Sequence, residues 1–600
     1  MIIIDSPGNI LKKVKTVPST TEWHWCYFGV NMNKKREMIL NLPASRRTHY
    51  SNEIYAYANE MKQPFLDWMA EINSGHKNDF RWWANRLPSK SIEQTDFYLL
   101  VCYFRIIKNW CLERSPIEGT LLIAIDDPFL LKMLNNCLKN HDSVRVGSPQ
   151  MTVIMCFIFT FIKMMARKTL FLLNGMISLL SDFKLKNRYK DKFHNMITDK
   201  PDVLIYTWVE QRSFDQAGRF KDVYLGELPS IYRDNNCRTV ITAPYWLPKS
   251  LKDKALKLKE EFVVVSFFLR FRDYLKAVFT FPLQYPERAK RFFLGDDYSH
   301  LFTREILSEI SSSAYMGNLC EYYGYRNYFN SHKDIKLFIY PFENQPWEKV
   351  VLLAMKHSNV HAKSAAYQHS TVPKLLLCYF LGKNESKSMP LPDCIVTNGK
   401  YYEDMMSKAN YNGVSIVNGG SLRYKKYSFP EASKVDNDTK PKLLIILPCS
   451  MERAMEMIYD LYDIANRDDY EIFIRPHPDL PRQKIHNIIR EMGEGIKISD
   501  TGDLAEILPE MNAVVHAGST AAIEAYYNGL EVFKYKTEFI DMDRLSDHKM
   551  MQKEIERSED VPRYANNYKR PDISTNILNE DVNKNVWRSL INNETKKYNE

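Results

Sequence analysis

The chain has 600 residues, of which 45% are hydrophobic and 26% are charged, and its formal net charge is +9 at pH 7. A chain of this length buries two or more hydrophobic cores, since domains of roughly 100–200 residues are the usual unit. The positive charge suits anionic substrates or an anionic membrane surface but is too small for a dedicated nucleic-acid-binding protein, so no nucleic-acid partner is expected. The ten cysteines include no Cys-x-x-Cys pair, which argues against a zinc knuckle and a disulfide framework.

The first residues of the chain are aromatic and polar without a clear period, and we assign residues 1–115 to an N-terminal extension of unassigned role. A strand is predicted at 120–125, where the sequence Asp-Asp-Pro stops it and a helical pattern follows. This is a βα unit. It opens an N-terminal Rossmann-like domain that we place at 116–425.

The most apolar part of the chain lies between Met151 and Leu180 and carries Lys163, Arg167 and Lys168 at its centre. Each apolar arm has only about a dozen residues, whereas a spanning helix needs roughly 20 without central charges, so no transmembrane helix is expected. Two interpretations stay open for this insertion, placed at 151–182. It is either a buried helical hairpin whose basic bend reaches solvent or an interfacial segment whose basic groups meet lipid phosphates.

The start of the chain bears on its location. Met1 is followed directly by three isoleucines, which lack the basic region and the length of a signal peptide. We therefore expect a cytoplasmic protein, with peripheral contact at the inner membrane if residues 151–182 are interfacial.

Further strands are predicted at regular intervals, at 203–208, 239–242, 262–266, 336–340, 364–367 and 394–397. Helical patterns separate most of them, so the sheet should be largely parallel. The polar stretch 425–442 contains Pro430 and Pro441 and is expected to be a linker. A second α/β series then forms a nucleotide-sugar-binding domain at 426–545, and residues 546–600 are a polar tail with no core of their own. The expected fold class is α/β, with two Rossmann-like domains facing across a cleft.

Two short signatures end consecutive strands of the second series, the sequences Arg-Pro-His-Pro at 475–478 and His-Ala-Gly-Ser-Thr at 516–520. Open α/β sheets bind ligands at the carboxyl ends of their strands. There Arg475 and His477 would supply cationic and hydrogen-bonding groups, and Gly518 would let the backbone approach an anion. Ser519 and Thr520 supply hydroxyls, and the next helix supplies free N–H groups. These hydroxyls are also natural helix caps, and capping uses the same N–H groups that bind phosphate. A nucleotide sugar would fit this site.

Each of these side chains has a second interpretation. Arg475 would contact a phosphate or pair with Asp479 or Glu471. His477 lies between two prolines, which fix the backbone and favour a ligand-facing imidazole over a structural turn residue. Glu524 would accept hydrogen bonds from ribose hydroxyls or stay a solvated helix carboxylate.

The two signatures also carry a resemblance to a family. An Arg-Pro-His-Pro turn followed by a His-x-Gly-Ser-Thr-x-x-x-Glu-Ala loop is similar to the C-terminal half of bacterial GT-B transferases that build surface polysaccharides. These include polysialyltransferases, capsule Kdo transferases and, more distantly, CDP-glycerol glycerophosphotransferases. Residues 340–348 and 366–373 also resemble the roughly 600-residue surface carbohydrate biosynthesis protein family of O-antigen loci. The resemblance covers residues 120 to 545.

The resemblance implies a GT-B glycosyltransferase of surface polysaccharide or O-antigen assembly. The implied donor is a CMP-activated nonulosonate or Kdo-type sugar, and the implied acceptor is a glycan or is lipid-linked. A CDP-polyol phosphate transferase and a nucleotide-sugar-binding or epimerase-like protein are the alternatives. No Asp-x-Asp motif follows a hydrophobic strand in a metal-binding context. Because GT-B enzymes commonly stabilise the leaving phosphate with helix dipoles and cationic side chains, we expect neither a metal nor a cofactor.

Catalysis requires a base that takes the proton from the acceptor hydroxyl. The candidates are Glu343, Glu348 and His369, which follow two predicted strands of the N-terminal domain. Resemblance to polysialyltransferases, whose base is acidic, favours Glu343. Resemblance to glycerophosphotransferases, whose base is a histidine, favours His369. Glu348 lies in a first helical turn, where the helix dipole alone favours an acid.

Overall fold

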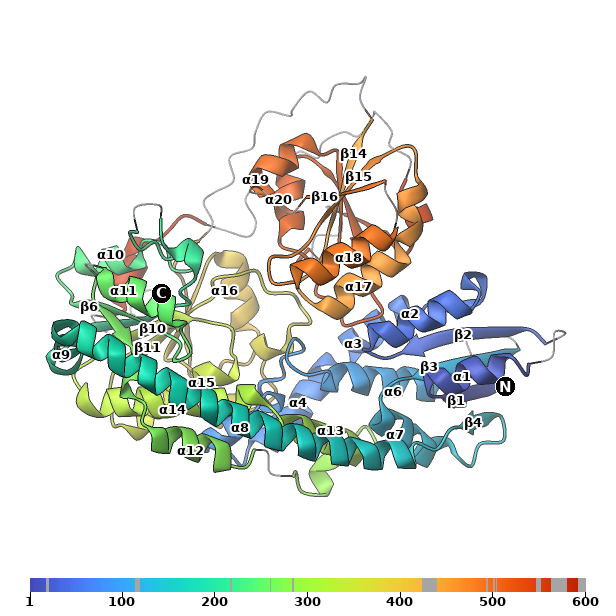
Figure 1. The fold of residues 1–600 in the computed structure, drawn as a ribbon, viewed down its shortest axis with the longest axis horizontal. Coiled ribbons are helices and arrows are strands. Elements are labelled where there is room, and N and C mark those ends of the chain that lie inside the picture. The colour runs from blue at the N-terminus through green and yellow to red at the C-terminus, as the bar shows by residue number, and fades with distance from the viewer. Residues whose placement is uncertain are drawn as a thin grey trace.

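Three parallel β-sheets organise the chain in the computed structural model (Figure 1). The structure describes residues 1–17, 21–113, 119–215, 218–258, 260–282, 285–423, 440–492, 495–499, 502, 504–545, 552–562 and 580–591. Each of the three sheets is the centre of one part of the molecule. In chain order, we call these parts the N-terminal unit, the middle domain and the C-terminal domain.

The N-terminal unit has its own sheet, with the strand order β2-β3-β1-β4 and all neighbours parallel. Its strands are β1 (Ile2–Asp5), β2 (Trp23–Phe28), β3 (Thr120–Ile125) and β4 (Val144–Val146). The expectation of an extension at 1–115 and of a next domain starting at 116 is therefore wrong. The predicted strand at 120–125 exists, but it lies between β2 and β1 instead of joining the next sheet. Helices α3 (Ser51–Glu60), α4 (Lys62–Asn73) and α6 (Phe97–Leu112) fill the long connection between β2 and β3.

The middle domain is built on a seven-stranded sheet with the order β13-β12-β11-β10-β5-β6-β7. All six predicted strands are present, and the prediction of a parallel sheet is confirmed. The strands are β5 (Val203–Tyr206), β6 (Thr239–Ala243), β7 (Phe262–Val264), β10 (Leu337–Pro341), β11 (Lys363–Tyr367), β12 (Cys394–Thr397) and β13 (Ser415–Asn418). Its helices include α12 (Phe271–Phe279), α14 (Ser313–Ser331), α15 (Pro346–His357) and α16 (Lys400–Ser407).

The C-terminal domain has a six-stranded parallel sheet with the order β16-β15-β14-β17-β18-β19. Its strands are β14 (Lys442–Ile446), β15 (Glu471–Arg475), β16 (Ile496–Ile498), β17 (Ala513–His516), β18 (Glu531–Tyr535) and β19 (Lys553–Ile555). Its helices include α17 (Met451–Asp460), α18 (Arg482–Met492) and α20 (Ala521–Tyr527). The middle and C-terminal domains are both Rossmann-like and face each other, so the expected α/β, GT-B-like fold class is confirmed. Most of the predicted linker, residues 424–439, lies outside the described residues.

The last part of the chain returns to the middle domain. In α21 (Lys584–Ser589), the Trp587 indole is fully buried, packs edge-on against the Tyr367 ring at 5.4 Å and donates a hydrogen bond to the Gly419 carbonyl at 3.0 Å. The tail predicted at 546–600 therefore contributes β19 to one domain and α21 to the core of another. The sequence predicted only a polar tail with no core of its own, and one large aromatic residue is enough to anchor a short helix in the core of another domain.

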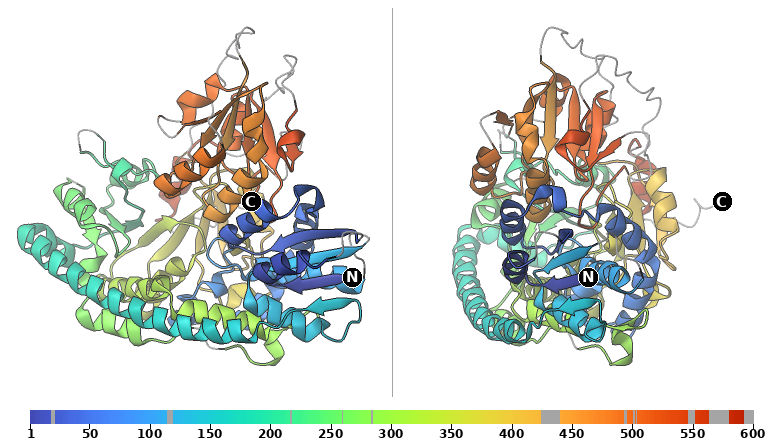
Figure 2. Two further views of the ribbon diagram at one scale, coloured as in Figure 1. Left: turned by 45° about the vertical axis from the view of Figure 1, so that its right-hand side comes forward. Right: turned by 90° about the vertical axis from the view of Figure 1, so that its right-hand side faces the viewer.

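Residues 150–188 form one long helix, α8 (Gln150–Arg188), which runs along the edge of the molecule opposite the C-terminal domain (Figures 1 and 2). Most of its residues are exposed. The buried-hairpin interpretation of residues 151–182 is therefore wrong, since the helix neither turns back nor enters the core. Among the described residues, no helix combines the length and the apolar character needed to cross a bilayer.

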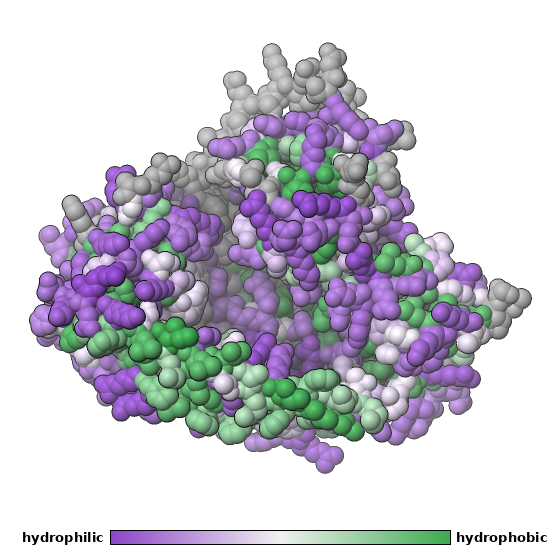
Figure 3. Space-filling view, in the orientation of Figure 1, coloured by the Kyte–Doolittle hydropathy of each residue, from purple (hydrophilic) through white to green (hydrophobic). Residues whose placement is uncertain are grey.

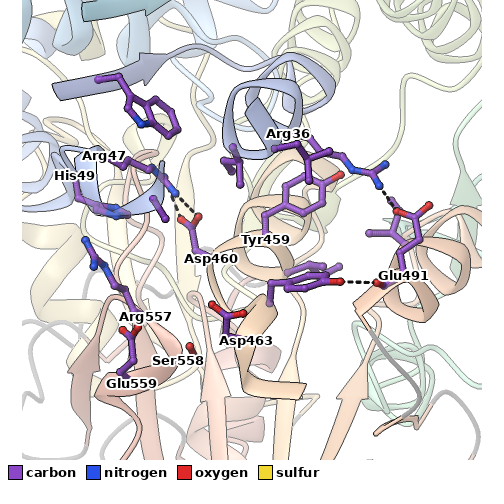
Figure 4. A pocket seen from close by; sticks show the side chains of 17 residues that line it. Arg36, Arg47, His49, Tyr459, Asp460, Asp463, Glu491, Arg557, Ser558 and Glu559 are labelled. Carbon is purple, nitrogen blue, oxygen red and sulfur yellow. Dashed lines mark hydrogen bonds and ion pairs between the residues drawn. The ribbon is translucent and has the colours of Figure 1, made fainter. Parts of the chain in front are cut away.

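A buried cluster of charges joins the N-terminal unit to the C-terminal domain. Lys35 Nζ lies 2.9 Å from both Glu456 and Glu538, and Arg47 lies 2.5 Å from Asp460 and 2.9 Å from Glu538. Figure 4 shows Arg47 and Asp460 at the contact between the two parts. The N-terminal unit also holds the middle domain through a fully buried ion pair, Lys90–Glu385 at 2.5 Å. It therefore bridges the two Rossmann-like domains.

Candidate active site

A cleft of about 450 Å³ opens between the middle and C-terminal domains, at the carboxyl ends of their strands. This is where open α/β sheets bind ligands, and the volume lies in the usual range for small-molecule sites. Eight of the nine predicted site residues line it, namely Glu343, His369, Arg475, His477, Gly518, Ser519, Thr520 and Glu524. The structure thus brings together residues that are up to 181 positions apart in the sequence.

The middle domain places Glu343 beside His369. In the register of β10 and β11, Pro341 lies opposite Tyr367, and each of the two site residues follows its strand by two positions. Nε2 of His369 is 3.8 Å from Oε1 of Glu343. The His369 side chain is only 4% exposed, whereas that of Glu343 is 34% exposed, and it faces the cleft. The carboxylate is therefore the member of the pair that a substrate can reach.

Burial moves the pKa values of this pair in opposite directions. It raises the pKa of Glu343 to about 7, with a further rise from Glu93 and an opposing effect from Arg423. Burial and then the Arg423 charge lower the pKa of His369 to about 3. The imidazole therefore stays neutral near pH 7, while the carboxyl group exchanges a proton there. An acid whose pKa lies near the working pH is well suited to general-base catalysis.

The ring of His369 is held by its surroundings. Trp208 and Tyr224 pack edge-on against it, with ring centroids 5.4 and 5.5 Å away. Its Nδ1 atom is buried and has no hydrogen-bond partner among the described residues. These contacts fix the ring beside Glu343.

Glu348 is the predicted site residue that does not reach the cleft. Its side chain is 2% exposed and accepts hydrogen bonds from the backbone N–H groups of Glu343 at 3.0 Å and Gln345 at 2.8 Å. Burial raises the pKa of Glu348. It occupies the third position of α15, where such acids satisfy backbone donors at a helix start. Glu348 therefore shapes the loop that carries Glu343.

On the C-terminal wall, Arg475 is oriented by the backbone. Its guanidinium donates to the carbonyls of Ser499 at 3.2 Å and Gly502 at 2.9 Å. Among the described residues it makes neither of the predicted pairs, and Glu471 instead pairs with Lys497. The side chain is half-buried and still lines the cleft.

The Pro-His-Pro turn fixes the neighbouring imidazole. Nδ1 of His477 accepts the backbone N–H of Asp479 at 3.2 Å, and burial lowers the pKa of this histidine. Because Nδ1 is an acceptor in the neutral ring, Nε2 carries the proton. The His477 side chain is 36% exposed, so this donor can meet an anionic ligand in the cleft.

The Gly518 loop approaches its surroundings too closely for a side chain. Gly518 has φ +91°, and a Cβ there would lie 2.6 Å from the Met542 carbonyl oxygen. Its N–H donates to His516 Nδ1 at 3.1 Å, and Ser519 Oγ accepts the Ala521 N–H at 3.2 Å. Ser519 therefore satisfies one backbone N–H at the start of α20, whereas Thr520, the N-cap residue, makes no side-chain capping bond. This hydrogen bond leaves the place of Ser519 on the cleft wall unchanged.

Two contacts join the domains across the cleft. Thr520 Oγ1 lies 3.5 Å from Thr371 Oγ1, and Arg544 donates to the Thr371 carbonyl at 2.9 Å. Thr371 follows His369 in the same loop, so the two walls of the cleft are held directly against each other.

Sequence reasoning missed Arg423, Arg453 and Arg544, which also line the cleft. Arg453 is 9% exposed and lines the cleft. A largely buried cation on a cleft wall suits an anionic ligand. The sequence contained a signal for Arg453, because this residue lies in the first turn of α17, the helix that follows β14, at the same sheet edge as the two signatures.

Glu93 shows that the N-terminal unit reaches the cleft as well.

A second cavity, of about 290 Å³, lies between the N-terminal unit and the C-terminal domain (Figure 4). Its charged side chains largely pair with one another, as in Arg47–Asp460 and Arg36–Glu491. This cavity is therefore part of the interface between these two units.

Among the described residues, no three or more His, Cys, Asp or Glu side chains are grouped to hold a metal ion.

Comparison with known proteins gives structural similarities alone. No family model matches the chain, and no curated protein sequence matches it. The glycotransferase of kitacinnamycin is similar at 10% identity over 66% of this chain and 90% of its own, with a TM-score of 0.32. The apo lipopolysaccharide outer core galactosyltransferase WaaB has 10% identity over 56% and 80%, with a TM-score of 0.30. UDP-GlcNAc 2-epimerase from Neisseria meningitidis, bound to UDP-GlcNAc, has 8% identity over 55% and 81%, with a TM-score of 0.29.

Proposed function

We propose that this protein is a GT-B glycosyltransferase that moves a sugar from a nucleotide donor to an acceptor hydroxyl. One observation carries the proposal. A cleft-facing carboxyl group, Glu343, lies across the same cleft from Arg453, Arg475 and His477, and burial raises the pKa of this carboxyl group to about 7. Sugar transfer needs a base on one side of the reacting carbon and stabilisation of a leaving phosphate on the other.

In the proposed reaction, the acceptor oxygen forms a bond to the anomeric carbon of the donor while the bond from that carbon to the phosphate oxygen breaks. The ionised Glu343 carboxylate takes the acceptor proton. Guanidinium groups and the Nε2 proton of His477 offset the negative charge that develops on the leaving nucleotide. The Gly518 loop lets the backbone approach the phosphate without steric interference from a side chain.

The protonation state of His369 favours Glu343 as the base. An imidazole whose pKa is about 3 binds protons weakly at neutral pH. We propose that His369 is a positioning residue, whose buried neutral ring packs beside the Glu343 carboxylate with Nε2 3.8 Å from Oε1. In the CDP-polyol phosphate transferase alternative the resemblance makes the histidine the base, and a neutral imidazole with this pKa is less suited to that role than Glu343.

The proposed donor is a CMP-activated sugar of the nonulosonate or Kdo type, and the proposed acceptor is a glycan or a lipid-linked glycan of surface polysaccharide or O-antigen assembly. The motif at 475–478 and the Gly-Ser-Thr loop support this choice by resemblance. Such a donor carries a carboxylate as well as a phosphate. The cleft holds four arginines, which is more cationic charge than one phosphate requires. We also propose a cytoplasmic location with peripheral membrane contact through residues 151–182.

The test is a transfer assay with CMP-, UDP-, GDP- and CDP-linked donors and oligosaccharide acceptors, with the products analysed by mass spectrometry. The proposal predicts release of the nucleotide and a product that has gained one sugar and no phosphorus. Phosphorus in the product would indicate the polyol-phosphate transferase. Turnover of the donor without any acceptor would indicate an epimerase-like protein.

A further inference from the structure

The long helix α8 exposes an extensive apolar surface. Fifteen of its large hydrophobic side chains, from Met151 to Phe183, are at least 42% exposed. Figure 3 shows them as a hydrophobic band along the lower edge of the molecule. Contiguous apolar surface on this scale is rare on soluble proteins and marks a docking site.

The exposed arc of α8 is broad. Phe157, Ile158 and Phe159 are consecutive and all exposed, which at about 100° per residue covers about 200° of the helix circumference. On the inner side, Gly175 packs closely on α12, because a Cβ there would lie 2.5 Å from the Tyr274 ring. A helix that pairs with a second helix presents a narrow seam. An arc this broad instead suits a helix that is half immersed in a flat apolar medium.

The charges on this helix complement an anionic surface. Between residues 150 and 181 the charged side chains are Lys163, Arg167 and Lys168, and none is acidic. Arg167 is exposed, and its guanidinium donates to the Ser311 carbonyl at 2.8 Å. Lys163 and Lys168 are five positions apart, so they project about 140° from each other, one on each flank of the apolar arc. Long lysine side chains in this position reach lipid phosphates while their stems stay in apolar surroundings.

The apolar surface continues onto the segment that follows α12, the helix beside α8. Phe279 and Phe281 are 72% and 74% exposed. The Phe281 ring lies 5.4 Å from Lys168 Nζ, which joins this segment to one flank of α8. The surface is therefore wider than a single helix.

From these observations we propose that α8, together with Phe279 and Phe281, is an in-plane docking face for an anionic lipid bilayer. Figures 1 and 2 place α8 at the opposite side of the molecule from the C-terminal domain. Docking through α8 therefore leaves the C-terminal domain, which carries the proposed phosphate-binding loops on its cleft side, on the side of the molecule away from the membrane. The middle domain, with Glu343, lies between the two. Where the docking is extended to a membrane-anchored acceptor, that extension rests on the proposed function.

The experiment is flotation of the full chain with vesicles of phosphatidylcholine alone or mixed with anionic phosphatidylglycerol. The wild type should float with the anionic vesicles at low salt and be released by high salt. Lys163→Gln/Lys168→Gln should lower the partition coefficient about 30-fold, since each basic residue near an anionic surface contributes about 1 kcal/mol. Phe159→Ser/Phe161→Ser/Ile162→Ser should abolish flotation with the anionic vesicles.

Two matched variants control for general effects. Arg167→Gln removes a basic residue of the same helix whose guanidinium is already bound to the Ser311 carbonyl, and Leu40→Ser removes a leucine of the N-terminal unit that is 71% exposed. Both should float like the wild type. Circular dichroism and thermal unfolding show whether each variant is folded.

Three outcomes overturn the proposal. The first is that the wild type does not float with anionic vesicles. The second is that the double lysine variant and the apolar triple variant both float as well as the wild type. The third is that analytical ultracentrifugation finds a dimer for the wild type and a monomer for the apolar triple variant. The last outcome would make α8 a contact between copies of the chain. Because flotation is measured without donor or acceptor, failure of the proposed function would leave this result unaffected, and transfer to a soluble acceptor would survive failure of the docking.

Discussion

Nε2 of His369 lies 3.8 Å from Oε1 of Glu343, at the ends of the neighbouring strands β11 and β10. Burial raises the pKa of the carboxyl group to about 7 and lowers that of the imidazole to about 3. Between these values both groups are neutral, and above pH 7 a carboxylate faces a neutral ring. Proton exchange near neutral pH therefore belongs to Glu343.

We expect Glu343→Gln to lower kcat by about 10²-fold or more, which is the usual contribution of a general base. Donor affinity should stay near that of the wild type, because the amide keeps the shape of the side chain and the phosphate-binding wall is untouched. The measurement is steady-state transfer combined with calorimetric donor binding. If Glu343→Gln transfers normally while His369→Ala is inactive, the histidine is the base.

The pH dependence provides a second prediction. The ionised form of Glu343 accepts the proton, so kcat should rise with pH through about 7 and then level off. The Glu343→Gln variant should lack this rise in its residual activity. An unchanged pH profile in the variant would assign the rise to another group.

The same carboxyl group should affect stability with the opposite sign. Its folded pKa, about 7, exceeds the ordinary value of 4.5, so the folded chain binds more protons than the unfolded chain between these values. The contribution of Glu343 to stability is therefore present below pH 4.5 and lost as the pH rises to 7. Glu343→Gln should raise the Tm relative to the wild type more at pH 8 than at pH 5, and equal differences at both values would contradict the burial effect.

On the C-terminal wall, we expect Arg453→Ala, His477→Ala and Ser519→Ala/Thr520→Ala each to weaken nucleotide binding, and the first to do so by at least tenfold. A charge-assisted hydrogen bond to phosphate contributes roughly 1.5–3 kcal/mol. The control is Arg36→Ala. Arg36 lies outside this cleft, at the contact between the N-terminal unit and the C-terminal domain, and its pair with Glu491 is exposed. Calorimetry on folded variants that bind like the wild type would remove these loops from the site.

Glycine 518 allows a test of the loop itself. Gly518→Ala places an L side chain at φ +91° and forces the Met542 carbonyl to move, whereas Gly295→Ala places one at φ +84° with no atom within 4 Å. Both should lose roughly 1–2 kcal/mol of stability to backbone strain. Nucleotide binding should fall in the Gly518 variant alone. Equal loss of binding in both would indicate general destabilisation.

Features of this chain that depend on residues close together in the sequence could be predicted, and features that depend on distant residues could not. The parallel strands of the middle and C-terminal domains, and eight of the nine site residues, follow from strand-end chemistry, because the register of neighbouring strands carries that chemistry to one edge. Glu348 lay outside the cleft because the same acid satisfies backbone donors at its helix start. No local feature of the sequence distinguishes an acid that satisfies backbone donors at a helix start from an acid that faces the cleft.

The errors concern long-range partners. The strand at 120–125 pairs with residues 2–5 and 23–28, which the sequence pattern cannot connect across a hundred intervening residues. Trp587 packs against Tyr367 in a domain that the chain left long before. The apolar segment at 151–182 was ambiguous because a buried hairpin and an exposed helix share one composition, and only packing distinguishes them.

The N-terminal unit should contribute to stability through its buried charges. Arg47→Met leaves Asp460 and Glu538 with less compensation at a buried site, and breaking such a network typically costs about 3–5 kcal/mol. Arg36→Met, which breaks the exposed pair with Glu491, should cost about 1 kcal/mol or less. Denaturant unfolding monitored by fluorescence compares the two variants. Equal costs would mean that the buried network does not hold the units together.

Calorimetric titration with CMP-, UDP-, GDP- and CDP-linked sugars tests most directly whether the cleft is a nucleotide-sugar site. The proteins to compare are the wild type, Glu343→Gln and the two wall variants Arg453→Ala and His477→Ala. We predict that at least one donor binds the wild type and Glu343→Gln with similar affinity, and that both wall variants bind it more weakly. Failure of every donor to bind the folded wild type, or binding that both wall variants leave unchanged, would contradict the proposed site.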